Sequence, residues 1–161
     1  MKWIKSASAG LLGSLVMFAL MMIGIKVTGI APFNMPPSAA FLKSMGLYAG
    51  PLALILHFGY GAFWSVLLLT IYKARVGIKK GVLLASLLWL FMMIVYSPII
   101  GWGFFGFGTA SSLDPSAPLY LEAGAKYMII TLVLHLIYGT IIGWGNASWI
   151  DHKITSGQAE D

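Results

Sequence analysis

The chain has 161 residues, of which 59% are hydrophobic and only 9% are charged. A soluble domain carries about 25% charged residues, so we expect lipid to be the solvent of this chain. The net charge of +5 does not indicate nucleic acid, because most basic residues lie beside apolar runs, where they act as topology signals. The absence of cysteine excludes disulfides, iron–sulfur clusters and thiol chemistry.

Four apolar segments are each long enough for a helix that crosses a bilayer, which needs about 20 residues. The sequence predicts spans over about residues 7–25, 48–72, 81–100 and 126–150. The first span follows two lysines and looks like a signal peptide. Because no A-x-A-like cleavage site follows it, we expect an uncleaved first helix. The fold class is therefore all-α: a polytopic membrane protein with a single domain over residues 1–161.

The segments that follow the first and third spans are rich in turn-forming and aromatic residues. Prolines after the first span break the helix and precede a stretch that we expect to form a short amphipathic turn at the interface. These prolines are Pro32, Pro36 and Pro37. Aromatic residues after the third span fit an aromatic belt at the membrane surface. They are Trp102, Phe104, Phe105 and Phe107. This second loop is either an interfacial loop or one that docks a partner or admits a substrate.

Basic residues predict the orientation of the chain. One side carries Lys2, Lys5, Lys73, Arg75, Lys79, Lys80 and Lys153. The other side carries Lys26, Lys43 and Lys126. The positive-inside rule places the richer side, with both termini, in the cytoplasm. We therefore expect a multi-pass protein of the inner (plasma) membrane that ends in a short cytoplasmic tail over residues 151–161.

The two halves of the chain resemble each other. A shift of 71 residues places Gly10–Ile23 on Gly81–Ile94, with identical residues at five positions. A shift of 78 residues superimposes "LHFGYG" of the second span on "LHLIYG" of the fourth. These shifts predict an internal repeat, 7–72 and 80–150. Because each repeat has two spans, the two helical hairpins are expected to be parallel, related by an axis along the membrane normal.

The repeated motif supplies a candidate central polar site. Its core is His57 and His135, and its flanking residues are Tyr60, Gly61, Tyr138 and Gly139. Positions i, i+3 and i+4 share one helix face, and intramembrane ionisable residues usually face the bundle interior. In the packing interpretation, each histidine donates a hydrogen bond across a helix interface and each glycine permits close approach. In the functional interpretation, the two imidazoles ligate a b-type haem.

Other chemistries have less support. The methionine pairs at 21–22 and 92–93 are interpreted as core packing, so no metal site is predicted. No Asp or Glu lies within a span, which disfavours proton-coupled transport. The acidic residues lie in loops or the tail, and no catalytic constellation is visible. The sequence therefore predicts a protein without enzymatic activity.

Several motifs together resemble a known family. They are the Gly-rich, Met-containing first span, "LHFGYGAFWSVLLLTIY", "PIIGWGFFGF" and "LHLIYGTIIGW". With them, nearly the whole chain resembles the YagU-like proteins, a poorly characterised family of small prokaryotic four-helix inner-membrane proteins. The resemblance implies a four-helix inner-membrane protein and supports the repeat. It implies no reaction, ligand or catalytic residue.

Three functional hypotheses remain open at this stage. The first is a structural or accessory subunit of a larger membrane assembly, with partners that are other membrane proteins or a second copy of the chain. The second is a haem-binding electron-transfer protein that uses His57 and His135. The third is a small transporter or lipid-handling protein. Each requires the lipid bilayer as a partner, and none involves nucleic acid.

Overall fold

The computed structural model describes residues 1–48 and 50–150. Four helical segments in these ranges are long and apolar enough to cross a membrane, which confirms the all-α class and the four spans. They are α1 (Lys2–Lys26), α3 (Gly50–Tyr72), the segment that starts with α4 (Ile78–Phe91), and α6 (Lys126–Ile150). The tail predicted over residues 151–161 lies outside the described residues.

The third span is not one continuous α-helix, which the sequence did not predict. It consists of α4, a π-helical turn labelled η2 (Met92–Tyr96), and a last turn labelled α5 (Ser97–Ile99). Pro98 has no backbone N–H to continue the α-helical hydrogen-bond ladder. The wider π turn lies directly before it, at a position where such a turn often marks a functional segment.

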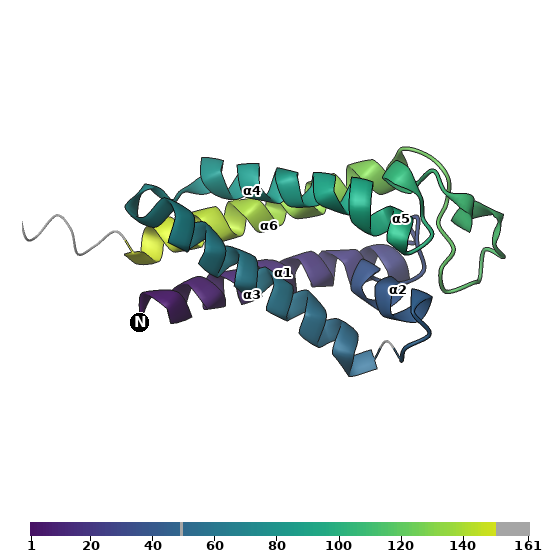
Figure 1. Ribbon diagram of the computed structural model, residues 1–161, viewed down its shortest axis with the longest axis horizontal. Helices are drawn as coiled ribbons and strands as arrows, with labels where there is room; N and C mark the ends of the chain where they lie inside the picture. Colours follow the sequence, from purple (N-terminus) through teal and green to yellow (C-terminus); the bar gives the residue numbers. More distant parts are fainter. Residues whose placement is uncertain (49, 151–161) are drawn as a thin grey trace, which may run out of the picture.

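The four long helices form an open arrangement rather than a closed bundle (Figure 1). Helices α1 and α6 pack against each other in the middle, α3 packs on α1, and α4 packs on α6, whereas α3 and α4 scarcely touch. The start of α1, the end of α6 and the short turn η1 (Lys73–Arg75) between α3 and α4 lie at one end. The short helix α2 (Pro37–Ser44) and α5 lie at the other.

Glycines make the closest crossing in each of the two hairpins. A Cβ atom at Gly10 of α1 would collide with the carbonyl oxygen of Gly61 of α3. In the same way, a Cβ atom at Gly81 of α4 would collide with the carbonyl oxygen of Gly139 of α6. Without hydrophobic driving force between helices in lipid, such small residues permit the backbone contact that stabilises the pair.

A buried polar network holds α1, α3 and α6 together near the end where the chain begins. The hydroxyl of Ser6 donates to the carbonyl of Ser65 at 2.9 Å, and the hydroxyl of Ser65 donates to the carbonyl of Ser6 at 2.7 Å. The side-chain amide of Asn146 donates to the Ser65 hydroxyl at 2.9 Å. Hydrogen bonds of this kind contribute about 0.6 kcal/mol each in a bilayer, and up to about 1.7 kcal/mol.

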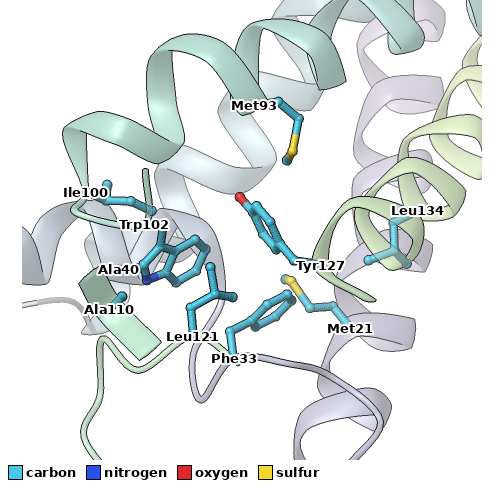
Figure 2. Close-up of a cluster of buried hydrophobic side chains, with 10 residues drawn as sticks. All are labelled: Met21, Phe33, Ala40, Met93, Ile100, Trp102, Ala110, Leu121, Tyr127 and Leu134. Carbon is cyan, nitrogen blue, oxygen red and sulfur yellow. The ribbon is translucent and has the colours of Figure 1, made fainter. Parts of the chain in front are cut away.

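The opposite end is closed by a cap built from the two long loops. The backbone N–H of Glu122 donates to the carbonyl of Pro32 at 2.7 Å, and the amide of Asn34 donates to the carbonyls of Pro115 and Ala117, both at 2.8 Å. Figure 2 shows the apolar cluster beneath this cap, in which side chains from both loops meet side chains of the helices.

The cap corrects the prediction for one aromatic residue. Trp102 does not belong to a membrane-surface belt: it is 0% exposed, stacks on Phe33 and donates its indole N–H to the carbonyl of Leu119 at 3.0 Å (Figure 2). Phe104 and Phe107 of the same loop are exposed. Composition alone cannot distinguish these roles, because the loop returns over Trp102 and covers it.

Candidate functional site

A cavity of about 610 Å³ lies where α3 and α4 fail to pack against each other. Helices α1 and α6 form its floor together with the side chain of His57, which reaches from α3 to α1, and α2 lies at the end of the cavity near the loop cap, called here its outer end. Ile55 and Phe63 of α3 and Phe91 of α4 line the cavity and are also largely exposed on the outer surface. The cavity is therefore a groove that opens sideways, in the direction that lipid would occupy. We refer to it as the α3–α4 groove.

The lining of the α3–α4 groove is mostly apolar and carries no ionic group. No Lys, Arg, Asp or Glu of the described residues lines it. Its polar groups are few and come from the floor, from both walls and from α2. They are Ser14, Ser38, His57, Tyr60, Tyr96, His135 and Tyr138. An apolar cavity of this size with a small number of polar side chains is the usual composition of a small-molecule binding site.

His57 is placed on the floor of the groove by a bond to the neighbouring helix. Its Nε2 lies 3.0 Å from the carbonyl oxygen of Ser14 on α1. The ring also packs against Phe18 of α1, with ring centroids 5.5 Å apart. This is the cross-helix hydrogen bond that the packing interpretation expects for His57.

His135 also lines the groove, but it bonds within its own helix. Its Nδ1 lies 2.7 Å from the carbonyl oxygen of Thr131, one turn earlier in α6, and only 7% of the residue is exposed. Thr131 is itself held by the indole N–H of Trp89, which donates to its hydroxyl at 3.1 Å. The packing interpretation therefore fails to describe the bonding of His135, since no helix interface is crossed.

The two histidine bonds determine which nitrogen of each ring carries the proton. A backbone carbonyl oxygen can only accept, so the ring nitrogen beside it must donate. In the neutral imidazole the other nitrogen is then an acceptor. His57 therefore presents Nδ1 as an acceptor, and His135 presents Nε2. The two histidines line one cavity, yet they are not equivalent in their bonding.

The two tyrosines of the motif occupy different environments. Tyr138 is 5% exposed, and its hydroxyl donates to the carbonyl of Gly61 at 2.6 Å, which ties α6 to α3. Tyr60 is 48% exposed, lines the groove and packs its ring edge to face against Trp64. Gly61 and Gly139 both lie at helix crossings. Of the four flanking residues, Tyr60, Gly61 and Tyr138 line the groove, and Gly139 does not.

At the outer end of the groove, next to α2, a contact between α2 and η2 closes the groove. The sequence did not predict this contact. Phe41 of α2 stacks on Tyr96 of η2, with ring centroids 5.3 Å apart. The hydroxyl of Tyr96 donates to the carbonyl of Pro37 at 2.8 Å. The signal that could have pointed to it is Pro98, since a proline near the end of a span suggests an irregular turn.

A symmetric pair of haem ligands would have to rearrange this site. His135 has the arrangement typical of a metal-ligating histidine, with one N–H donated to a carbonyl and Nε2 free. His57 has its Nε2 engaged with Ser14 and offers only Nδ1. Within residues 1–48 and 50–150, no three His, Cys, Asp or Glu side chains gather as a metal site would require.

Comparison with known proteins yields no relative. The chain matches no family model, no curated protein and no solved structure. The resemblance to the YagU-like family therefore stays a prediction.

Proposed function

We propose that this chain is a non-enzymatic integral membrane protein that binds an amphiphile of the bilayer in the α3–α4 groove. The observation that carries the proposal is the groove itself: about 610 Å³, mostly apolar, without ionic lining among the described residues, and open between two helices. This proposal is the lipid-handling hypothesis from the sequence analysis, with the α3–α4 groove as the binding site.

The physical argument concerns what can fill the groove in a membrane. Water gains few hydrogen bonds from such a lining, so acyl or isoprenoid chains are the natural occupants. A lipid tail gains little from an apolar wall alone, because bulk lipid is equally apolar. Affinity above that of bulk lipid must therefore come from shape and from the polar groups on the floor, which include His57 and His135.

Photolabelling of the purified protein in vesicles tests this proposal. A lipid with a photoreactive group in its tail should label residues at the mouth, such as Phe63 and Phe91, more than lipid-facing residues elsewhere. Gly59 lines the groove and has open space at its Cβ position. Gly59→Trp should therefore fill the groove and reduce this labelling, whereas Leu15→Trp, at an exposed position on α1, should not. Uniform labelling of all exposed helices, unaffected by Gly59→Trp, would contradict the proposal.

An accessory subunit is the second candidate, and one observation favours it. Among the described residues, α3 and α4 make few contacts with each other although each packs closely on another long helix, so a partner helix could complete this interface. Affinity purification from native membranes would then yield a stoichiometric membrane partner, and loss of that partner in Gly59→Trp would locate it in the groove. Repeated isolation of the chain alone would exclude this candidate.

The haem hypothesis is retained because of the free Nε2 of His135. It predicts a Soret band in protein purified after expression with ample haem. A preparation without that band, from cells with sufficient haem, would exclude it.

The repeat and the orientation are also part of the proposal. The equivalent glycine pairs, Gly10 with Gly61 and Gly81 with Gly139, make the same kind of crossing in both hairpins. Their positions differ by 71 and 78, the two shifts of the sequence comparison. These contacts support a parallel repeat. The distribution of basic residues supports cytoplasmic termini in the inner membrane.

A further inference from the structure

We infer that the amphiphile of the α3–α4 groove is uncharged and carries a hydroxyl group that donates a hydrogen bond: an alcohol or phenol on an apolar tail. The inference rests on the proposed function and names the class of ligand for the same site. It follows from which hydrogen-bonding groups the groove offers and from which charges it lacks.

The groove offers acceptors. The N–H of His57 is used by the carbonyl of Ser14, and the N–H of His135 is used by the carbonyl of Thr131. Both rings line the groove, and neither makes another hydrogen bond within the described residues. Each neutral imidazole therefore retains one unused acceptor nitrogen. A ligand that donates a hydrogen bond can satisfy such a nitrogen, whereas a ligand that only accepts cannot.

The groove cannot neutralise an ionic head. Among the described residues, no lysine or arginine lines it to pair with a phosphate or a carboxylate, and no aspartate or glutamate lines it to pair with an amine. An unpaired charge in such surroundings is strongly unfavourable. A hydroxyl group avoids this penalty and still donates to an imidazole. Tyr60 lines the same groove, so its hydroxyl can take part in a second bond to such a head.

The rest of the groove suits a tail. Ile55, Phe63 and Phe91 surround the mouth and are exposed toward the lipid. A chain can therefore extend from the groove into the bilayer while the head stays on the floor beside His57 and His135. Selection between amphiphiles then falls on the head, because tails of equal length gain equally from the walls.

The test compares three probes that share one photoreactive C16 chain: the free alcohol, its methyl ether and its phosphate monoester. We expect the alcohol to label the groove about three- to twenty-fold more than the ether, the ratio that corresponds to one hydrogen bond within a bilayer. The phosphate monoester should label it less than the alcohol. Equal labelling by alcohol and ether, or stronger labelling by the phosphate, would overturn the inference while leaving the proposed function intact. Absence of groove labelling by all three would overturn the proposed function itself.

Variants assign the preference to the histidines. His57→Phe combined with His135→Phe should abolish the difference between alcohol and ether. Phe63→Leu, a substitution at the mouth without polar change, should retain it. Ether labelling serves as the folding control, because it reports the groove without the head contact. If the ether still labels the double variant and the alcohol still labels it more strongly, the histidines do not bind the head group. This result would overturn the inference.

Discussion

Tyr138 and Tyr60 occupy equivalent places in the repeated motif, but Tyr138 is the one whose hydroxyl makes a hydrogen bond between two long helices. The Tyr138 hydroxyl joins α6 to the Gly61 carbonyl of α3 across the middle of the molecule. Tyr138→Phe should lower the free energy of unfolding by about 0.6 to 1.7 kcal/mol, as expected for one hydrogen bond in a bilayer. Tyr60→Phe is the matched control and should change it by less. The measurement is reversible unfolding in mixed micelles, and an equal loss in both variants would contradict this assignment.

Two glycines on α3, two residues apart, provide a sharper comparison. Gly61 lies at the crossing with α1, where an added methyl group would meet the Ser14 side chain, whereas nothing lies within 4 Å of the Cβ position of Gly59. Gly61→Ala should destabilise the protein by about 1 to 3 kcal/mol through overpacking. Gly59→Ala should be neutral, or stabilising by up to about 1 kcal/mol through helix propensity. Thermal unfolding in detergent distinguishes them, and similar melting temperatures would refute the crossing.

At this scale the sequence could identify residues but not their bonds. The repeated motif predicted that His57 and His135 belong to one central polar site, and both line one groove. The spacing could not show that one ring bonds to Ser14 on another helix while the other bonds to Thr131 on its own. That difference depends on the distance between the helices at each histidine, and the amino-acid sequence alone does not give this distance.

The next scale is that of the elements that close the groove. Helix α2 is held to η2 by the Phe41–Tyr96 stack and by the hydrogen bond from Tyr96 to the Pro37 carbonyl. Tyr96→Phe keeps the stack and removes the bond, so the outer end of the groove should open more often. We expect maleimide to modify a cysteine placed by Ser38→Cys, which lines the groove, about threefold faster in this background.

The chain contains no cysteine of its own, so a single introduced thiol reports one position. Ser44→Cys, at the exposed end of α2, is the control for this labelling and should react at the same rate with or without Tyr96→Phe. An unchanged rate at both positions would mean that the Tyr96 bond does not keep α2 in place.

Element length and polarity were predictable, because a bilayer imposes about 20 apolar residues on each span. The four spans therefore coincide with the helices to within a few residues, although α1 begins as early as Lys2. The π turn at Met92–Tyr96 was not predicted, because Pro98 signals an irregular turn near the end of the span but does not specify its form. The burial of Trp102 was also missed, because it depends on a loop that folds back over it.

At the scale of the whole molecule, the orientation in the membrane is open to direct measurement. The basic residues predict that the turn between α3 and α4 faces the cytoplasm and that the long loop before α6 faces outward. In intact cells, a membrane-impermeant maleimide should modify Ser112→Cys but not Gly77→Cys, and both should react after permeabilisation. Modification of Gly77→Cys alone in intact cells would reverse the predicted orientation.

The openness of the whole arrangement could not be inferred from the repeat. If the proposed repeat had perfect twofold symmetry, the contact between α1 and α6 would be matched by one between α4 and α3, because the repeat would relate α1 to α4 and α3 to α6. The first contact is extensive and the second is nearly absent. The groove therefore lies where the symmetry of the proposed repeat would place a closed interface.

Because of the same asymmetry, one end of α3 is fixed to its neighbour while the other end has room to move. Gly61 and Ser65 fasten it to α1, while its first residue, Gly50, lies eleven residues further out (61 − 50), about 16 Å at 1.5 Å per residue. A swing of about 10° around Gly61 would carry that end by about 3 Å with this rise. Such a rotation leaves the hydrogen bonds between Ser6 and Ser65 in place and stretches the one between His57 and Ser14. Small rotations about Gly61 are therefore amplified into changes in the width of the mouth. The rate at which ligands enter would then depend on the contact between Gly10 and Gly61, which lies at the centre of this rotation.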